Sequence, residues 1–299
     1  MVLKPWEEGQ LFEMESDLRL IGSSAVRPGD FNARMTEITS FGRFRFTSKY
    51  PIGPTVGYDY TQILLDGRRI ALPASNLVDF SIGVGSPVAP LGAFGPVRRG
   101  FLGVSAGLGY AGDGPFANDN AWYAKGSLMM GGEIDDNTSV IALIEFDGNR
   151  GIFPDLPMLG FGYAKTVSPE LEYVVGTFMY LNWQPRKDLT FEVLWEPIYD
   201  LSVSLEYELH KGWKAYVSYA SIEEAFTVED LPRNRRLFYT EQQAELGINW
   251  EPSNSVSMLL AGGYAFERQF SSGWDDRSLT RIADLDDAPY ARVEISLRF

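Results

Sequence analysis

Apolar and polar side chains alternate along most of the chain from about residue 31 onward. In residues 201–210, leucine, valine and tyrosine hold the odd positions, whereas serine, glutamate and histidine hold the even ones. Residues 189–195 and 243–250 repeat this alternation. A period of two is that of a β-strand whose two faces meet different environments. The pattern therefore predicts a protein built mainly of strands.

Turn-forming residues separate these segments, for example at residues 51–53, 112–114 and 211–212. The expected strands, about 12–14 in number, fall near residues 31–47, 54–65, 76–87, 98–111, 119–131, 136–147, 158–166, 170–182, 189–195, 201–210, 212–222, 243–250, 254–267 and 288–299. Residues 1–30 are less periodic and contain the turn sequence Arg27-Pro28-Gly29-Asp30. We expect residues 1–30 to form an N-terminal arm or plug, and residues 31–299 to form the sheet.

Two features separate a membrane barrel from a soluble β-sandwich, which also alternates. Many predicted strands reach about 10 residues, the length that a tilted membrane-spanning strand needs, whereas strands commonly have about 5 to 6. The connections also differ, because the turn at 211–212 is short while residues 223–235 and 269–286 read as long acidic loops. We therefore expect an all-β fold, a transmembrane antiparallel up-and-down β-barrel.

Composition narrows the classes of function. The chain has 299 residues, no cysteine and a formal net charge of −14. The lack of cysteine excludes thiolate catalysis and thiolate metal sites, and the acidic balance argues against nucleic acid as a partner. No segment approaches the roughly 18 to 20 apolar residues of a spanning helix. The first ten residues lack the apolar core of a signal peptide, so we expect an exported protein to be a mature form.

The last ten residues, from Tyr290 to Phe299, form an alternating segment that ends on an aromatic side chain. Val293, Ile295, Leu297 and Phe299 share one face of it. This terminus resembles the closing-strand signal of bacterial outer-membrane proteins, and the whole chain resembles uncharacterised porin-like barrel families. The resemblance implies a location in the bacterial outer membrane, contact with its lipid and lipopolysaccharide, and insertion by the barrel assembly machinery.

Tryptophans lie near the ends of several predicted strands. The sequence Asn-Trp-x-Pro occurs at residues 182–185 and 249–252, which fits an interfacial aromatic belt better than a tryptophan packed at a plain hairpin turn. The residues that we assign to the belt are Trp183, Trp195, Trp213 and Trp250. If both Asn-Trp-x-Pro turns are periplasmic, Phe299 is periplasmic too, but the similar short turn at 135–137 falls on the outside. One strand boundary between residues 136 and 182 is therefore misplaced.

Charged residues on the faces opposite the apolar stripe are expected to line the barrel interior. The acidic ones are Glu192, Glu206, Glu208, Glu241, Glu245 and Glu294. The basic ones are Arg43 and Arg45 on an early strand, and Arg292 and Arg298 on the last strand. Closure would gather these arginines at the seam, opposite an acidic wall. Such an interior is either a water-filled bore that prefers cations or a salt-bridge network that fills the barrel.

The sequence holds no convergent set of catalytic residues. Its one histidine, His210, lies beside a tight turn without an evident partner. The glycines of residues 83–85 and 107–109 lie on strands and not at a helix start, so we do not expect them to bind phosphate. The acidic turns lack the spacing of a calcium-binding loop. We expect no catalytic residue, no metal and no cofactor, which makes a membrane hydrolase the weakest hypothesis.

Two hypotheses of different classes follow. The first is a porin-like passive channel for ions or small polar solutes. The second is a structural barrel with a filled or plugged lumen, which would anchor a partner protein through its arm and acidic loops. Both are compatible with a homo-oligomer.

Overall fold

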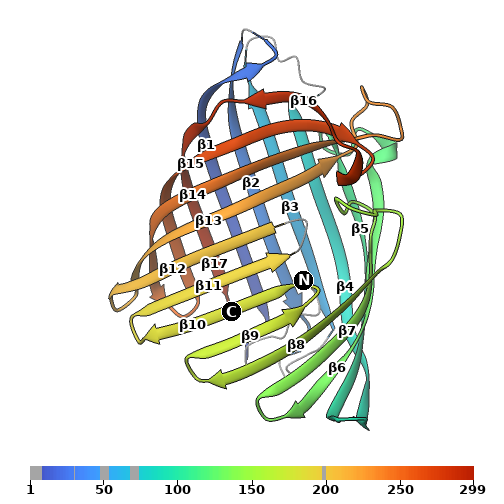
Figure 1. The fold of residues 1–299 in the computed structure, drawn as a ribbon, viewed down its shortest axis with the longest axis vertical. Coiled ribbons are helices and arrows are strands. Elements are labelled where there is room, and N and C mark those ends of the chain that lie inside the picture. Colours follow the sequence, from blue (N-terminus) through green and yellow to red (C-terminus); the bar gives the residue numbers. More distant parts are fainter. Residues whose placement is uncertain (1–8, 30, 48–53, 68–73, 197–199) are drawn as a thin grey trace.

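The computed structural model describes residues 9–29, 31–47, 54–67, 74–196 and 200–299. Their strands form one antiparallel sheet that closes on itself (Figure 1). The strands are β1 (Phe12–Arg27), β2 (Phe31–Arg45), β3 (Thr55–Asp66), β4 (Asn76–Phe94), β5 (Val97–Asp113), β6 (Trp122–Asp135), β7 (Thr138–Asp147), β8 (Met158–Ser168), β9 (Leu171–Gly176), β10 (Met179–Arg186), β11 (Leu189–Glu196), β12 (Asp200–His210), β13 (Trp213–Phe226), β14 (Arg236–Ser253), β15 (Val256–Gly273), β16 (Thr280–Leu285) and β17 (Ala288–Arg298).

The predicted up-and-down barrel is confirmed, with a larger number of strands than the 12–14 expected. Strands β16 and β17 share one position in the wall, because both pair with β15 on one side and with β1 on the other. The barrel therefore has 16 positions. Two short 3-10 helices, η1 (Asp119–Ala121) and η2 (Asp276–Ser278), lie in its connections. No helix in the described ranges is long and apolar enough to cross a membrane.

Strand β1 corrects the expectation of an N-terminal arm or plug. Residues 12–27 form a full wall strand between β2 and β17. Its alternating residues carry four charges, on Glu13, Glu15, Asp17 and Arg19. The strand is stable in the wall because Glu13, Asp17 and Arg19 form ion pairs with residues of the neighbouring strands. Local periodicity does not reveal these pairs. Residues 1–8 of the expected arm lie outside the described residues.

The segment at 170–182 is two strands and not one. Strand β9 ends at Gly176 and β10 begins at Met179, so residues 177–178 form a tight turn. This extra turn is the misplaced boundary between residues 136 and 182. With it, the short turns at 95–96, 136–137, 169–170, 187–188, 211–212 and 254–255 all fall at one end of the barrel.

The two ends of the barrel differ. The end with these short turns, here the turn end, also holds the C-terminus, where the Phe299 N–H donates to the Phe12 carbonyl at 2.9 Å. The opposite end, here the loop end, carries longer connections such as residues 148–157, 227–235 and 274–279. The last two are shorter than the predicted acidic loops, because β13 and β15 extend further than expected and β16 occupies residues 280–285.

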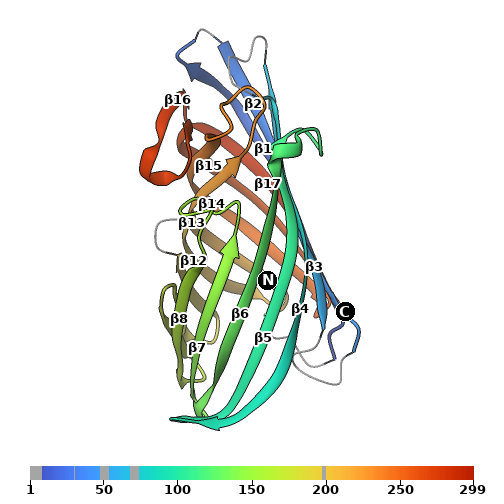
Figure 2. The same ribbon diagram turned by 90° about the vertical axis from the view of Figure 1, so that its right-hand side faces the viewer.

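The wall has uneven height, as Figures 1 and 2 show. Strands β4, β14 and β15 have 18 to 19 residues, whereas β9, β10 and β11 have 6 to 8. Above the short strands, β13 meets β5, which is not its neighbour in the sheet. The Thr227 N–H donates to the Ala111 carbonyl at 2.9 Å, and Gly112 pairs with Thr227. This contact draws the loop-end parts of β1–β5 and β13–β17 into a narrower ring.

The hydrophobic core fills the inside of this narrow ring. Ile63, Leu77, Phe226, Leu237 and Phe270 are all 0% exposed and belong to one cluster contributed by β1–β4 and by the chain from β13 to β17. Burial of large apolar side chains in a closed ring stabilises it and excludes water. The straight route along the barrel axis is therefore closed at the loop end.

Candidate functional site: the barrel interior

The outer surface of the wall is apolar. Leu205 on β12, Val217 on β13, Leu246 on β14 and Leu260 on β15 are between 39% and 70% exposed. Leu205, Val217 and Leu246 lie side by side in register, so they form a continuous band. A soluble protein would bury such side chains, whereas a closed barrel in lipid turns them outward.

Tryptophans lie on this outer surface near both ends. Trp213 and Trp250 are paired across β13 and β14 with ring centroids 5.7 Å apart, and Trp183 lies near the same turn end. Trp195 lies towards the loop end of β11. All four are between 39% and 46% exposed, and their place in an interfacial belt stays a prediction.

A closed sheet with an apolar outside and a charged inside is inverted relative to a soluble protein, and lipid is the solvent that it fits. The chain has the architecture of a transmembrane β-barrel.

Comparison with known proteins gives loose overlays only. No protein-family model and no curated protein matches the chain. A bacterial polysaccharide outer membrane secretin overlays with a TM-score of 0.41 at 8% identity, covering 97% of this chain and 98% of the other. An outer membrane channel from Pseudomonas putida F1 gives 0.38 at 9%, covering 98% and 97%, and the translocator domain of the autotransporter NalP from Neisseria meningitidis gives 0.33 at 10%, covering 97% and 89%. These overlays are too loose to bear on the activity of this barrel.

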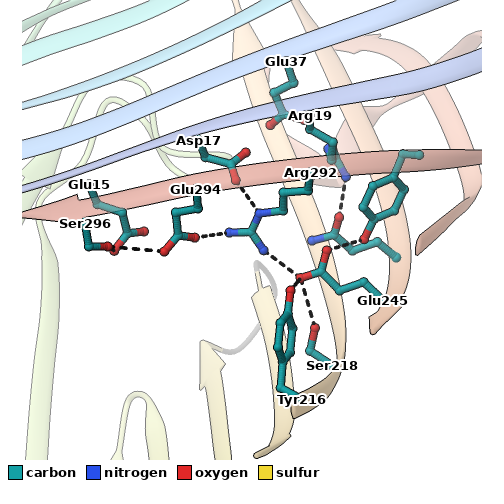
Figure 3. Close-up of polar contacts among 12 residues, drawn as sticks. Glu15, Asp17, Arg19, Glu37, Tyr216, Ser218, Glu245, Arg292, Glu294 and Ser296 are labelled. Atoms are coloured by element: carbon teal, nitrogen blue, oxygen red, sulfur yellow. Dashed lines mark hydrogen bonds and ion pairs between the residues drawn. The ribbon is translucent and has the colours of Figure 1, made fainter. Parts of the chain in front are cut away.

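Arg292 on β17 is the centre of a charged network inside the barrel (Figure 3). Its guanidinium donates to Asp17 on β1, to Glu245 on β14 at 2.7 Å and to Glu294 at 2.6 Å. Glu245 also accepts the hydroxyls of Tyr216 at 2.8 Å and Tyr290 at 2.9 Å. The charge-assisted bonds satisfy a carboxylate that is almost fully buried.

A second part of this network lies closer to the loop end. Arg19 on β1 donates to Glu37 on β2 and to Glu241 on β14. Arg268 on β15 lies 3.5 Å from Glu241 and donates to the Tyr239 hydroxyl at 3.2 Å. These contacts join strands that are far apart in sequence across the inside of the wall. The network fills the interior next to β1, β2, β14 and β17.

The strand pairing corrects the expected seam, because β2 and β17 are not direct neighbours. Strand β1 lies between β2 and β17 and supplies carboxylates to both. Glu13 lies 2.6 Å from Arg43 and 3.8 Å from Arg298, while Arg45 donates to the Gln10 carbonyl. Charges of opposite sign therefore alternate along this wall, and no purely acidic wall faces a basic one.

The remaining predicted acidic residues lie on the other side of the interior. Glu192 on β11 shares a face with Ser204, and accepts the Tyr180 hydroxyl at 2.8 Å. Glu206 lies 3.8 Å from Lys214, and Glu208 is exposed near the turn end. These side chains are part-exposed, unlike the buried network, so water reaches the interior beside β11–β13.

Small residues widen the interior beside β3–β6. Gly57, Gly83, Gly107, Ser105 and Ser127 line a hollow of about 260 Å³ there. On the same part of the wall, the ring of Tyr123 packs over Gly109. A side chain at residue 109 would prevent this contact, because its Cβ would be 2.1 Å from the ring. Tyr123 thereby reaches Asp79 on β4, with 2.8 Å between hydroxyl and carboxylate. The glycines noted in the sequence thus make room inside the barrel.

An acidic cavity of about 430 Å³ continues from this hollow below the narrow ring. We call it the mouth, and it shares Asp59, Ser81, Lys125, Glu145 and Asp147 with the hollow. Its carboxylates are Asp59, Asp79, Glu145, Asp147, Glu196, Asp200, Glu223 and Glu224, and its bases are Lys125 and Arg150. Sequence reasoning missed these acidic residues because most of them lie near strand ends, where alternation is hard to extend.

The described residues show no arrangement suited to catalysis. His210 is exposed at the end of β12. Ser81 accepts a hydrogen bond from Lys125 at 3.2 Å, and Lys125 also lies 3.6 Å from Asp147, so an ion pair holds the amine beside the serine. No group of three or more histidine, aspartate or glutamate side chains that could hold a metal ion occurs in the described ranges. The expectation that the barrel is not an enzyme stays a prediction.

Proposed function

We propose that this barrel is a passive channel of the bacterial outer membrane for ions or small polar solutes, and that it prefers cations. The observation that carries the proposal is the mouth, where eight carboxylates and two basic side chains line a cavity below the narrow ring. Fixed carboxylates in a confined space raise the local concentration of cations and repel anions. The turn end would face the periplasm and the loop end the outside.

The route would run off the barrel axis. From the mouth it would follow the glycine-lined hollow of β3–β7 and the part-exposed faces of β11–β13. At the turn end it would leave through a cavity of about 1140 Å³, lined by residues that include Glu15, Glu206, Lys214 and Glu294. The salt-bridge network would hold the opposite wall rigid without lining the narrowest passage.

A filled structural barrel is the second candidate. It is favoured by the apolar core of the narrow ring, which blocks the straight route through the loop end. Such a barrel would be silent in a bilayer and would act by anchoring a partner protein or a second copy of itself.

Substituted cysteines separate the two candidates, because the chain has no cysteine of its own. Leu194 shares the inner face of β11 with Glu192 and is 37% exposed, whereas its neighbour Val193 lies on the outer face beside Val203. In planar bilayers, modification of Leu194→Cys by a charged thiol reagent should reduce the single-channel current, and a cationic reagent should react faster than an anionic one. Val193→Cys is the matched control and should keep its current.

One result would contradict the channel, and another would contradict the proposed route. Folded wild-type protein that carries no current would favour the filled barrel. An unchanged current after complete labelling of Leu194→Cys would show that the route does not pass β11.

A further inference from the structure

We infer that residues 148–157, the connection between β7 and β8, form a lid over the mouth, and that Arg236 is the latch that holds the lid closed. This inference rests on the proposed channel function and adds a gate to it. Nothing in the sequence pattern of this connection indicates the role, because the contacts that carry it join distant parts of the chain.

Asn149 ties the lid to both walls of the mouth. Its side-chain amide donates to the Asp79 carboxylate on β4 at 2.8 Å and to the Ala225 carbonyl on β13 at 2.9 Å. The side chain therefore bridges the acidic cavity from one wall to the other. A cation that enters from the loop end meets this bridge first.

Arg236 holds the lid from the start of β14. It is 4% exposed, and its guanidinium donates to the carbonyls of Asn149 at 3.0 Å and Arg150 at 2.8 Å. The same guanidinium donates to the Trp274 carbonyl at 3.0 Å, in the connection between β15 and β16. One buried side chain thus joins two loops that are more than one hundred residues apart.

The connection at 274–279 completes the latch. The Asp276 N–H donates to the Gly151 carbonyl at 3.2 Å, and the Arg277 guanidinium lies 4.0 Å from the centre of the Phe153 ring. Phe153 has a φ of 49°, which is uncommon for a residue with a bulky side chain. The closed lid therefore depends on contacts that offset local strain, and loss of the latch should release it.

Both oxygens of Asp276 and one oxygen of Glu223 are buried without a hydrogen-bond donor among the described residues. The two carboxyl groups lie close to each other beside Arg236, and they repel one another when both are charged. Unsatisfied carboxyl groups at the lid contact disfavour the closed state relative to an open one in which water reaches them. The lid is thus held by Arg236 and opposed by this acidic pair.

The test compares Arg236→Met with Arg233→Met in planar bilayers, after each folded protein has been verified by its heat-modifiable mobility. Arg233 lies exposed in the connection between β13 and β14 and serves as the matched control. Arg236→Met should raise the open probability several-fold, while Arg233→Met should behave as wild type. Equal open probability in all three proteins would overturn the lid, whereas silence of wild type and Arg236→Met alike would overturn the channel itself.

A reversible lock keeps the inference testable if Arg236→Met does not fold. Gly151 and Asp276 lie on facing backbones, so the pair Gly151→Cys and Asp276→Cys places two thiols across the lid contact. Oxidation should lower the current and a reducing agent should restore it. A current that is the same in the oxidised and reduced states, with disulfide formation shown by mass spectrometry, would exclude a moving lid.

Discussion

Removal of the Arg292 guanidinium tests whether the internal network stabilises the barrel. Arg292→Met keeps most of the side-chain volume but leaves Asp17, Glu245 and Glu294 without their shared cation. The side chains of these carboxylates are between 2% and 15% exposed. Breaking a buried ion pair by removing one partner costs about 3 to 5 kcal/mol, because the remaining charge stays buried. That loss corresponds to a factor of roughly one hundred to several thousand in the unfolding equilibrium.

Urea unfolding of the protein in lipid vesicles, followed by tryptophan fluorescence, measures this effect. Arg99→Met is the control, because the Arg99–Glu133 pair is exposed at 72% and 46% and such pairs contribute about 0 to 1 kcal/mol. The double variant Arg292→Met with Glu245→Gln should lose less than the sum of the single losses, since Gln leaves no buried charge at Glu245. If Arg292→Met unfolds within about 1 kcal/mol of Arg99→Met, the network does not carry the stability assigned to it.

Three further predictions concern the wall, the terminus and the lid. Leu205→Arg places a charge in hydrocarbon and should cost about 2 to 4 kcal/mol near the midplane, whereas Ser204→Arg faces the interior and should be tolerated; equal urea midpoints would disprove the facing. Phe299→Ala should lower the yield of folded protein in cells, measured by heat-modifiable mobility, and a normal yield would argue against an assembly role. Burial raises the pKa of Asp276 in the closed lid, next to Glu223, Asp275 and Arg236. Closure is therefore favoured while Asp276 is protonated and weakens as pH rises above the ordinary aspartate value of about 4. Open probability should rise with pH in wild type and rise less in Asp276→Asn, because the carboxyl group of Glu223 remains at the lid contact. A pH response of unchanged size in Asp276→Asn would exclude Asp276.

The wall could be predicted from the sequence because alternation is a local property. Leu205 and Ser204 reveal their opposite faces from five or six residues of pattern. Strand β1 was missed because its charged face makes a polar segment, and its partners lie on other strands. The turn at Thr177 and Phe178 was missed because neither residue is a strong turn former.

The interior could be predicted only in part. Alternation placed Glu245 and Arg292 on a common side, but their contact depends on the register between β14, β15 and β17. The mouth and the lid depend on contacts between residues that are far apart in sequence. Asn149 contacts Asp79, seventy residues away, and Arg236 donates to the Asn149 carbonyl, eighty-seven residues away. The sequence pattern does not predict such contacts, because they depend on the contact between β13 and β5 in the narrow ring.

The reversal potential of the wild-type protein under a potassium chloride gradient tests whether the barrel is a cation-selective channel. The acidic mouth predicts cation selectivity at low salt, which should fade as the Debye length shortens from about 10 Å at 0.1 M to about 3 Å at 1 M. Neutralising Glu145, Glu196 and Asp200 by Gln, Gln and Asn should reduce the selectivity without removing the current, because these mouth carboxylates lie outside the buried network. A wild-type reversal potential that shows selectivity for anions would contradict a cation channel.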